Sequence, residues 1–277
     1  IQCDTFKIIE EMIVKTMHQL MMQNALPVRE WRSILSERSR SYWYHTQFER
    51  MYLFMEEALN VYDLRESFKQ AEVPKNGEEW FALYTEKQFK VDYRYRQMFR
   101  CYHAVQNEEL VADLYEKLTY WYENEFLVKW SQWTDGIVTR ELATQWKIPG
   151  ILHQQDFFRK CIQPILEGTR ERVFIIISDA LRYEIGYELK EGFSNVLNAE
   201  VSLQAMQGVL PSYTQLGMAA LLPGNVTNIL ENGTVEVDGL SKKGMLNRTK
   251  LLQSKVVDSI AYDLMDFMQL SKEQGHE

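Results

Sequence analysis

Cysteine is scarce in this sequence of 277 residues: there are three, Cys3, Cys101 and Cys161, and no two of them form a CxxC pair. A disulfide framework or a structural zinc site needs several cysteines at short or regular spacings. The sequence therefore excludes both as organising features. We expect the three residues to be buried, reduced thiols.

Histidine is nearly as scarce, with five residues in the whole sequence. A helix presents two imidazoles to one metal ion when they are four residues apart. None of the four histidines before residue 171 has another at that spacing, so we do not expect them to bind metal: they are His18, His45, His103 and His153.

Long apolar runs and excess positive charge are also lacking. No run reaches the roughly 18 to 20 apolar residues that a membrane span needs, and no basic and apolar leader is present. The net charge of -8 argues against a protein that chiefly neutralises phosphates. We expect a cytoplasmic protein without a membrane partner. The start at Ile1 rather than Met, and the polar end at 271–277, suggest a piece of a longer chain.

Glycine is rare in the first part of the sequence and common in the second. Residues 1–170 contain four of the 13 glycines, 28 of the 35 aromatic residues and all seven tryptophans. Residues 171–277 contain the other nine glycines, together with short Val and Ile runs. This change in composition predicts two architectures, a helical domain over 1–168 and an α/β domain over 169–277.

Apolar residues in the first part recur at steps of three and four, which is the period of an amphipathic helix. One such stripe runs from Phe6 to Leu20 and stops before Pro27. Two further stripes run from Trp43 to Leu59 and from Leu110 to Trp130. Asn76 and Gly77 predict a turn before another helix. The first part is therefore expected to be a helical bundle or array.

Basic and aromatic residues alternate in Tyr93-Arg94-Tyr95-Arg96, and a basic cluster covers 29–40. Such segments can stack on nucleic acid bases. Aromatic residues at helical spacing more often form a core, with basic residues on its solvated face. We favour the structural interpretation for both segments.

In the second part of the sequence the apolar residues no longer follow the helical spacing. Residues 172–178 form a continuous β-branched run, which is typical of a strand buried on both faces of a parallel sheet. A helix is expected from Ala180 to a stop at Gly192, a second strand over 199–206, and a second helix over 215–222. This order predicts a right-handed βαβ unit in an open parallel sheet.

Further elements are expected after the second helix. They are an edge strand over 234–237, a helix over 244–254, a strand over 255–260 and a last helix over 262–270.

Two polar residues lie at the predicted carboxyl edge of this sheet, where ligands bind in such folds. Asp179 ends the first strand, and Thr214 opens the second helix. A carboxylate suits a divalent cation, and a hydroxyl at a helix N-terminus suits phosphate chemistry. Both residues are also common helix caps. Spacing alone leaves the two interpretations open.

The residues around this pair resemble a known family. The strings IIISDALRYE at 175–184, VLPSYTQLGMAALLP at 209–223 and DGLSKKGMLNR at 238–248 are similar to the PglZ domain. PglZ proteins belong to the alkaline phosphatase superfamily and act in the BREX type of bacteriophage defence. The resemblance covers about 170–277, and the helical part shares no short motif with the family.

The resemblance implies an α plus α/β chain, in which an all-helical region precedes the first half of an alkaline-phosphatase-like parallel sheet domain. It implies that Asp179 is a metal ligand and that Thr214 is a metal-bound nucleophile. The cofactors would be divalent metal ions (Zn, Mn or Mg), and the reaction hydrolysis of a phosphomonoester or phosphodiester. Partners would be other BREX proteins, such as a methyltransferase or a small accessory protein, and DNA through the complex.

This sequence departs from the family pattern in its lack of further ligands. The superfamily uses Asp and His residues downstream of the nucleophile, whereas 171–275 contain no histidine. We therefore expect the chain alone to be inactive. The alternative is a scaffold that binds a partner through its helices. Four basic residues are candidate phosphate contacts, although a surface role is favoured for each: Arg182, Lys242, Lys243 and Arg248.

Overall fold

The computed structural model describes residues 6–105, 108–168, 172–196, 199–241 and 244–270. Cys3, Lys242, Lys243 and His276 therefore lie outside the described residues. The chain forms two compact units. The helical unit comprises Ile1–Ala143 and Tyr183–Val201, and the sheet unit comprises Thr144–Arg182 and Ser202–Glu277.

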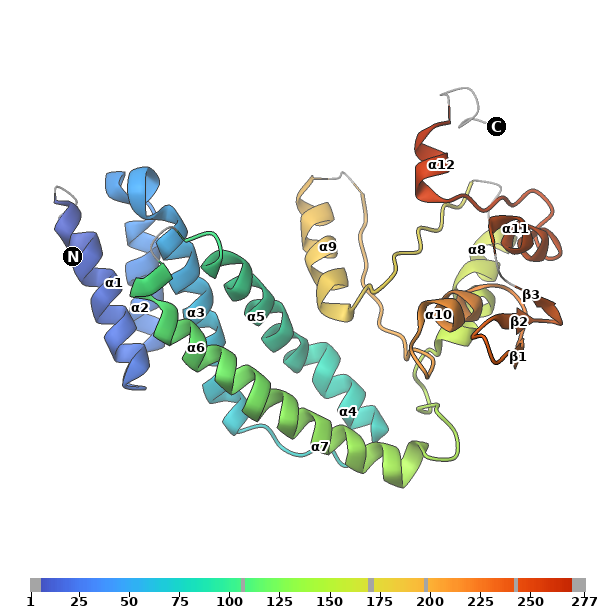
Figure 1. Cartoon of the computed structure of the whole chain (residues 1–277), viewed down its shortest axis with the longest axis horizontal. Coiled ribbons are helices and arrows are strands. Elements are labelled where there is room, and N and C mark those ends of the chain that lie inside the picture. Colours follow the sequence, from blue (N-terminus) through green and yellow to red (C-terminus); the bar gives the residue numbers. More distant parts are fainter. Residues whose placement is uncertain (1–5, 106–107, 169–171, 197–198, 242–243, 271–277) are drawn as a thin grey trace. The chain divides into compact units, whose positions relative to one another are not determined.

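The helical unit is built from α-helices, several of which continue into π-helical turns (Figure 1). Its α-helices are α1 (Lys7–Met22), α2 (Val28–Arg38), α3 (Glu49–Lys69), α4 (Gly77–Leu83), α5 (Phe89–Tyr102), α6 (Ala112–Trp121), α7 (Leu127–Ile137) and α9 (Tyr183–Val196). Its π-helical turns are Tyr44–Phe48, Tyr84–Gln88, Tyr122–Phe126 and Val138–Leu142, and a 3₁₀ turn spans Glu108–Leu110. The predicted helical architecture of the first part is confirmed.

Local sequence explains where these helices begin and end. The stripe from Phe6 becomes α1, which ends before Pro27 as predicted. Asn76 caps α4, because its side chain accepts a hydrogen bond from the backbone N–H of Glu79 at 2.8 Å. Glu78 and Glu79 in the first turn also interact favourably with the helix dipole.

The core of the helical unit lies around α3. This helix packs against α5, α1, α2 and α6. Its side chains Phe54 and Leu59 are completely buried, and Phe68 contacts Phe126 with ring centroids 4.9 Å apart. Burial of large apolar and aromatic groups is the main stabilising contribution here. Aromatic residues at helical spacing thus form a core, as the structural interpretation expects.

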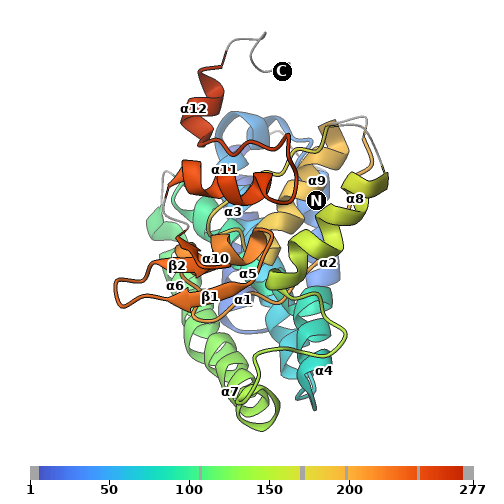
Figure 2. The same ribbon diagram turned by 90° about the vertical axis from the view of Figure 1, so that its right-hand side faces the viewer.

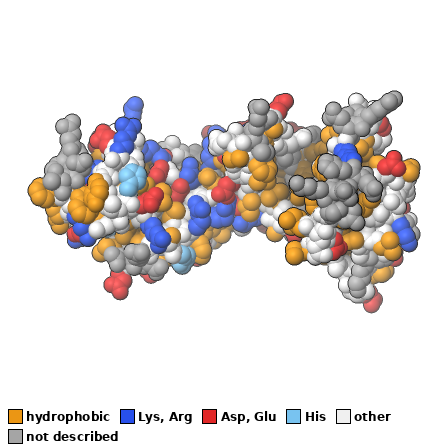
Figure 3. Space-filling view, turned by 90° about the horizontal axis from the view of Figure 1, so that it is seen from above, with side chains coloured by type: hydrophobic (Ala, Val, Ile, Leu, Met, Phe, Trp, Pro, Cys, Tyr) orange, Lys and Arg blue, Asp and Glu red, His pale blue; other side chains and the backbone are white. Residues whose placement is uncertain are grey.

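The basic residues between those aromatics also have structural contacts. Arg94 forms an ion pair with Glu57 at 2.9 Å, and Tyr95 stacks on Tyr122 with centroids 3.8 Å apart. On the face that Figure 3 shows, Lys and Arg side chains of the helical unit lie among Asp and Glu side chains. This arrangement gives no support to a nucleic-acid site at 93–96.

A buried ion pair joins α1 to α2 in the same unit. Arg38 donates hydrogen bonds to the completely buried Glu10, which also accepts from Tyr52 and Ser41. Burial by itself would raise the pKa of Glu10, but the hydrogen bonds from Arg38, Tyr52 and Ser41 outweigh it and hold the pKa below its usual value. Arg38 of the 29–40 cluster is therefore a structural residue.

The helix that follows Asp179 packs differently from the prediction. We expected it to begin at Ala180, end at Gly192 and cover a parallel sheet. It is α9, which begins at Tyr183, contains Gly192 and packs against α5 of the helical unit. Tyr187 contacts Phe89 with centroids 4.9 Å apart, and Glu188 pairs with Arg96 at 2.7 Å. These aromatic and charged contacts account for its position on α5.

The sheet unit contains a small antiparallel sheet in the order β1-β2-β3 (Figure 2). Its elements are α8 (Gln163–Gly168), α10 (Thr214–Leu221), β1 (Val226–Ile229), β2 (Val235–Val237), β3 (Leu240–Ser241), α11 (Met245–Gln253) and α12 (Leu264–Met268), with a 3₁₀ turn at Gln154–Asp156 and a π-helical turn at Phe158–Ile162. Val226 pairs with Val237, and Glu236 with Ser241. The positive φ of Asp238 and Gly239 closes the β2–β3 turn.

The predicted parallel sheet is absent from the described residues, and this prediction was wrong for the structure of this chain. Residues 172–178 have no strand structure, and Ile176 is 91% exposed. Residues 199–206 also form no strand, although Gln207 makes an isolated parallel bridge with His153. A strand forms only when a neighbour pairs with its backbone. No such neighbour lies beside 172–178 among the described residues.

The smaller predictions in this part had mixed outcomes. A strand within 234–237 and a helix within 244–254 are confirmed by β2 and α11. The predicted edge position of the strand was wrong, because β2 pairs with β1 on one side and β3 on the other. The last helix is α12, which is shorter than expected. The strand predicted over 255–260 was wrong, because these residues form turns and irregular backbone.

Cys101 and Cys161 are free and half-buried. Within the described part of the chain, no helix is both long and apolar enough to cross a bilayer.

Candidate functional site

The two residues predicted for the sheet edge lie in contact in the sheet unit. The hydroxyl Oγ1 of Thr214 donates to the Asp179 carboxylate, with distances of 3.1 Å to Oδ2 and 3.3 Å to Oδ1. They are 35 residues apart in the sequence. Both side chains are exposed to solvent. The structure therefore brings the two candidates together at an accessible position without the parallel sheet that was expected to do so.

Asp179 lies in a tight turn rather than at a helix cap. Ala180 has a φ of 56°, which is unusual for a residue with a Cβ atom, and its N–H donates to Asp179 Oδ1 at 3.0 Å. Because α9 begins only at Tyr183, Asp179 does not cap it. In this turn the Asp179 carboxylate also accepts a hydrogen bond from the Thr214 hydroxyl. Left-handed conformations of this kind cost energy and are concentrated at functional sites.

Thr214 is the first residue of α10, and its side chain does not cap this helix. The capping position is Tyr213, which makes no side-chain cap hydrogen bond. The N-terminal N–H groups of a helix and its dipole favour a negative charge nearby. Thr214 therefore carries a hydroxyl group, which can act as a nucleophile, at a helix N-terminus that favours an anionic phosphate. Leu216, Ala219 and Ala220 anchor α10 by burial.

The loop before α10 is fixed by two glutamines that the sequence analysis did not identify. Gln154 accepts from Val209 N–H at 3.0 Å and donates to the Gly217 carbonyl at 2.9 Å. Gln207 accepts from Ile148 N–H at 2.8 Å. These contacts join residues about 55 to 63 apart. No local pattern signals such pairs, so the tertiary structure was needed to find them.

His153 pairs with the same loop through its backbone, in the isolated bridge with Gln207. Burial lowers the pKa of His153, and the nearby Lys147 lowers it further. Its Nδ1 accepts from the Gln155 N–H at 3.3 Å. A neutral imidazole is consistent with this acceptor role.

Asp179 and Thr214 fit a divalent cation in ligand type but not in number. Both offer oxygen atoms, which hard cations prefer. Zinc sites use three or four protein ligands, and magnesium sites hold further oxygens from carboxylates, substrate or water. Among the described residues, no group of three or more His, Cys, Asp or Glu side chains could hold a metal ion. The pair alone is thus at most part of a metal site.

Two of the basic candidates, Arg182 and Arg248, lie in described parts of the sheet unit. Arg248 lies on α11, where its guanidinium contacts Met245 Sδ at 3.6 Å. Arg182 lies in the exposed turn before α9. The hydrogen bond described for the Arg248 guanidinium reaches neither Thr214 nor Asp179.

Comparisons with known proteins identify the family of the second part. The BREX system PglZ alkaline phosphatase-like domain matches residues 157–277. The chain is 30% identical to the alkaline phosphatase-like protein PglZ of Bacillus cereus (strain H3081.97) over 99% of its own length and 32% of that protein. It is 31% identical to the alkaline phosphatase-like protein BrxZ of Escherichia coli O9:H4 (strain HS), over 100% of its length and 33% of that protein.

The similarity therefore extends across the helical part, for which the sequence analysis found no motif. The chain spans about one third of the length of these two curated relatives. No solved structure matches. The strings around Asp179 and Thr214, the family match and the two relatives agree: residues 157–277 belong to the BREX system PglZ alkaline phosphatase-like domain family.

Proposed function

We propose that this chain is part of a metal-dependent phosphoester hydrolase that acts in bacteriophage defence. Thr214 is the nucleophile, and Asp179 is a metal ligand that also orients its hydroxyl. The observation that carries the proposal is the 3.1 Å hydrogen bond from Thr214 Oγ1 to Asp179 Oδ2. The family match supports the reaction class.

In this reaction Thr214 Oγ1 attacks the phosphorus atom of the ester. A new bond forms between Oγ1 and phosphorus and the bond from phosphorus to the leaving oxygen breaks. The proton that the hydroxyl loses is balanced by the proton that the leaving oxygen takes up from solvent to depart as the alcohol. Water then releases phosphate from Thr214 and restores the hydroxyl. A divalent cation, when bound, would supply charge stabilisation and a lower hydroxyl pKa. The chain itself supplies the oriented hydroxyl, the carboxylate and the N-terminus of α10.

The remaining metal ligands are proposed to come from sequence outside this chain, which spans about a third of its curated relatives. One carboxylate and one hydroxyl leave most of the cation's coordination to water, so binding would be weak. The chain alone is therefore expected to show no turnover.

The test compares the chain alone with a protein of the relatives' full length. Each is assayed with manganese, zinc or magnesium on a phosphomonoester and a phosphodiester. We expect activity only in the longer protein, with a loss of at least a hundredfold in Thr214→Ala and in Asp179→Ala, because a nucleophile and a ligand are removed. Thr214→Ser should retain part of the activity, because it keeps a hydroxyl at this position.

Circular dichroism of each variant would separate loss of chemistry from loss of fold. Equal turnover of Thr214→Ala and the parent would contradict the nucleophile assignment. Metal-dependent turnover by the 277-residue chain, abolished in Thr214→Ala, would contradict the incomplete site.

A second candidate function is a scaffold that binds another BREX protein through the helical unit, such as a methyltransferase or a small accessory protein. The observation that favours it is the apolar outer face of α1, where Ile8 and Met12 lie four residues apart and are 55% and 60% exposed. Exposed apolar side chains gathered on one face are typical of binding surfaces.

Copurification with each candidate partner tests the scaffold function. The double substitution Ile8→Glu and Met12→Glu should abolish binding, and Lys15→Glu on the same helix should have a smaller effect. Retained binding in the double variant would exclude this face.

A further inference from the structure

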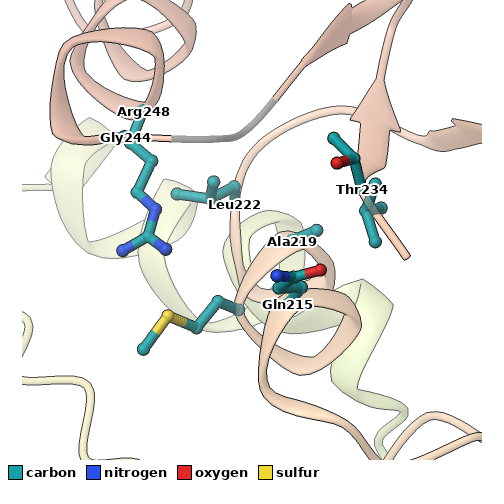
Figure 4. Close-up of a pocket in the computed structure, with 8 residues that line it drawn as sticks. Gln215, Ala219, Leu222, Thr234, Gly244 and Arg248 are labelled. Atoms are coloured by element: carbon teal, nitrogen blue, oxygen red, sulfur yellow. The ribbon is translucent and has the colours of Figure 1, made fainter. Parts of the chain in front are cut away.

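A small pocket in the sheet unit lies between α10, β2 and α11 (Figure 4). It holds about 120 Å³, which is the space of roughly four water molecules at about 30 Å³ each. Its lining residues are Gln215, Met218, Ala219, Leu222, Thr234, Val235, Gly244 and Arg248. Gln215, Met218 and Ala219 lie three and four residues apart on one face of α10, and Leu222 directly follows this helix.

Among the described residues that line this pocket, Arg248 is the one charged residue, and none is acidic. Its Nε is buried and has no hydrogen-bond partner among the described residues. Its only hydrogen bond described is the weak one from Nη1 to Met245 Sδ at 3.6 Å. Leaving a buried charged donor unpaired is costly. An anion bound in the pocket would therefore give the buried Nε–H of Arg248 a hydrogen-bond acceptor.

Two uncharged polar side chains complete the polar part of the lining. Gln215 comes from α10 and Thr234 from the segment that leads into β2. In Figure 4 the amide nitrogen of Gln215 lies on the side of Arg248, and the hydroxyl of Thr234 lies on the other side of the amide. The three polar side chains of the lining come from three different segments.

We propose that this pocket binds a single phosphate group, held by Arg248 with help from Gln215 and Thr234. Guanidinium donors match phosphate oxygens well, and hydroxyl and amide donors add further hydrogen bonds. Donors from three separate side chains match the several oxygens of a phosphate better than the two oxygens of a carboxylate. The volume admits such a group but not a nucleoside, since drug-sized ligands occupy pockets of about 300 to 1,000 Å³.

This site is distinct from the proposed catalytic pair. Neither Asp179 nor Thr214 lines the pocket, and no metal ion is needed for the guanidinium to bind phosphate. Phosphate binding in this pocket can therefore be tested independently of the proposed hydrolase function. The bound group could be free phosphate or the terminal phosphate of a larger ligand that extends out of the pocket.

Calorimetric titration of the 277-residue chain with inorganic phosphate, in metal-free buffer, tests the proposal. We expect saturable binding to one site, weakened at least tenfold in Arg248→Met and partly restored in Arg248→Lys. Lys250→Met is the matched control, because Lys250 is an exposed cation on the same helix α11. It should leave binding within about twofold. Thr214→Ala and Asp179→Ala should also bind as the parent does.

Titrations with acetate and with a phosphomonoester sharpen the assignment. Acetate should bind more weakly than phosphate, and tighter binding of the monoester would identify a larger ligand. Gln215→Ala provides a second variant if Arg248→Met does not fold. Absence of phosphate binding, equal weakening by Lys250→Met, loss of binding in Thr214→Ala, or acetate binding as tight as phosphate would each overturn the proposal.

Discussion

The helical unit and the sheet unit differ in how completely they bury their apolar side chains. Phe54 of the helical unit is 0% exposed, whereas Phe174 of the sheet unit is 71% exposed. The core around α3 draws on six helices, while the sheet unit has a small cluster around α10, β2 and α11. The same residue type is therefore a core residue in one unit and a surface residue in the other.

The reason for this difference is where each kind of element finds its hydrogen bonds. A helix satisfies most of its backbone groups internally and then needs only one apolar contact face. A strand must find partner backbones, which often lie far away in the sequence. Helices could therefore be predicted from local pattern here, whereas residues 172–178 have the composition of a strand without a strand neighbour among the described residues.

A matched pair of phenylalanine substitutions tests the comparison with the largest expected effect. Phe54→Ala should lower the free energy of unfolding of the helical unit by about 3–5 kcal/mol, because it removes a buried ring and leaves a cavity. Phe174→Ala should change stability by less than about 0.5 kcal/mol. Urea unfolding followed by tryptophan fluorescence measures both, since six of the seven tryptophans lie in the helical unit. Equal effects would show that 172–178 are buried in solution.

The ion pair inside the helical unit predicts an acid-sensitive core. Glu10→Gln should cost about 3 kcal/mol at pH 7, because it leaves Arg38 buried without its counter-charge. The folded pKa of Glu10 is lowered, so its contribution is present above the unfolded pKa and is lost as pH falls through the folded pKa. Stability measured from pH 7 to pH 3 should fall less steeply in Glu10→Gln than in the parent.

The matched control for this ion pair is Asp156 in the sheet unit, whose pKa is lowered to about 2, chiefly by a hydrogen bond from Arg159. Arg159 is largely exposed, so solvent screens the pair. Asp156→Asn should cost about 1 kcal/mol at pH 7, a contribution that is lost as the pH falls through about 2. A larger loss of stability in Asp156→Asn than in Glu10→Gln would contradict the expected order of the two effects.

The smallest expected difference concerns two helix caps. Asn76→Ala should cost about 1 kcal/mol, because it removes the acceptor for the first N–H groups of α4. Asp263 caps α12 in the same way, by accepting from Met265 N–H at 2.9 Å. Since α12 buries none of its residues, Asp263→Ala should change global unfolding by less than about 0.3 kcal/mol. Thermal unfolding of both variants measures the contrast.

The candidate site was partly predictable from the sequence. Asp179 and Thr214 were identified as neighbours on the assumption of a parallel sheet edge, and they are in contact although that sheet is not present in the described residues. Their chemical roles, and the domain boundary at 168/169, stay predictions. Gln154 and Gln207 were missed because their partners are about 55 to 63 residues away.

The sequence by itself determined the helical architecture of the first part, the turn at Asn76 and Gly77, the family strings and the two candidate residues, since each depends on neighbours within a few turns of the chain. Only the tertiary structure decided that α9 packs on α5, that Gln154 and Gln207 hold the loop before α10, and that Arg248 faces a small pocket. These features depend on contacts between distant segments. Such contacts are set by the packing of whole surfaces, which local periodicity does not encode.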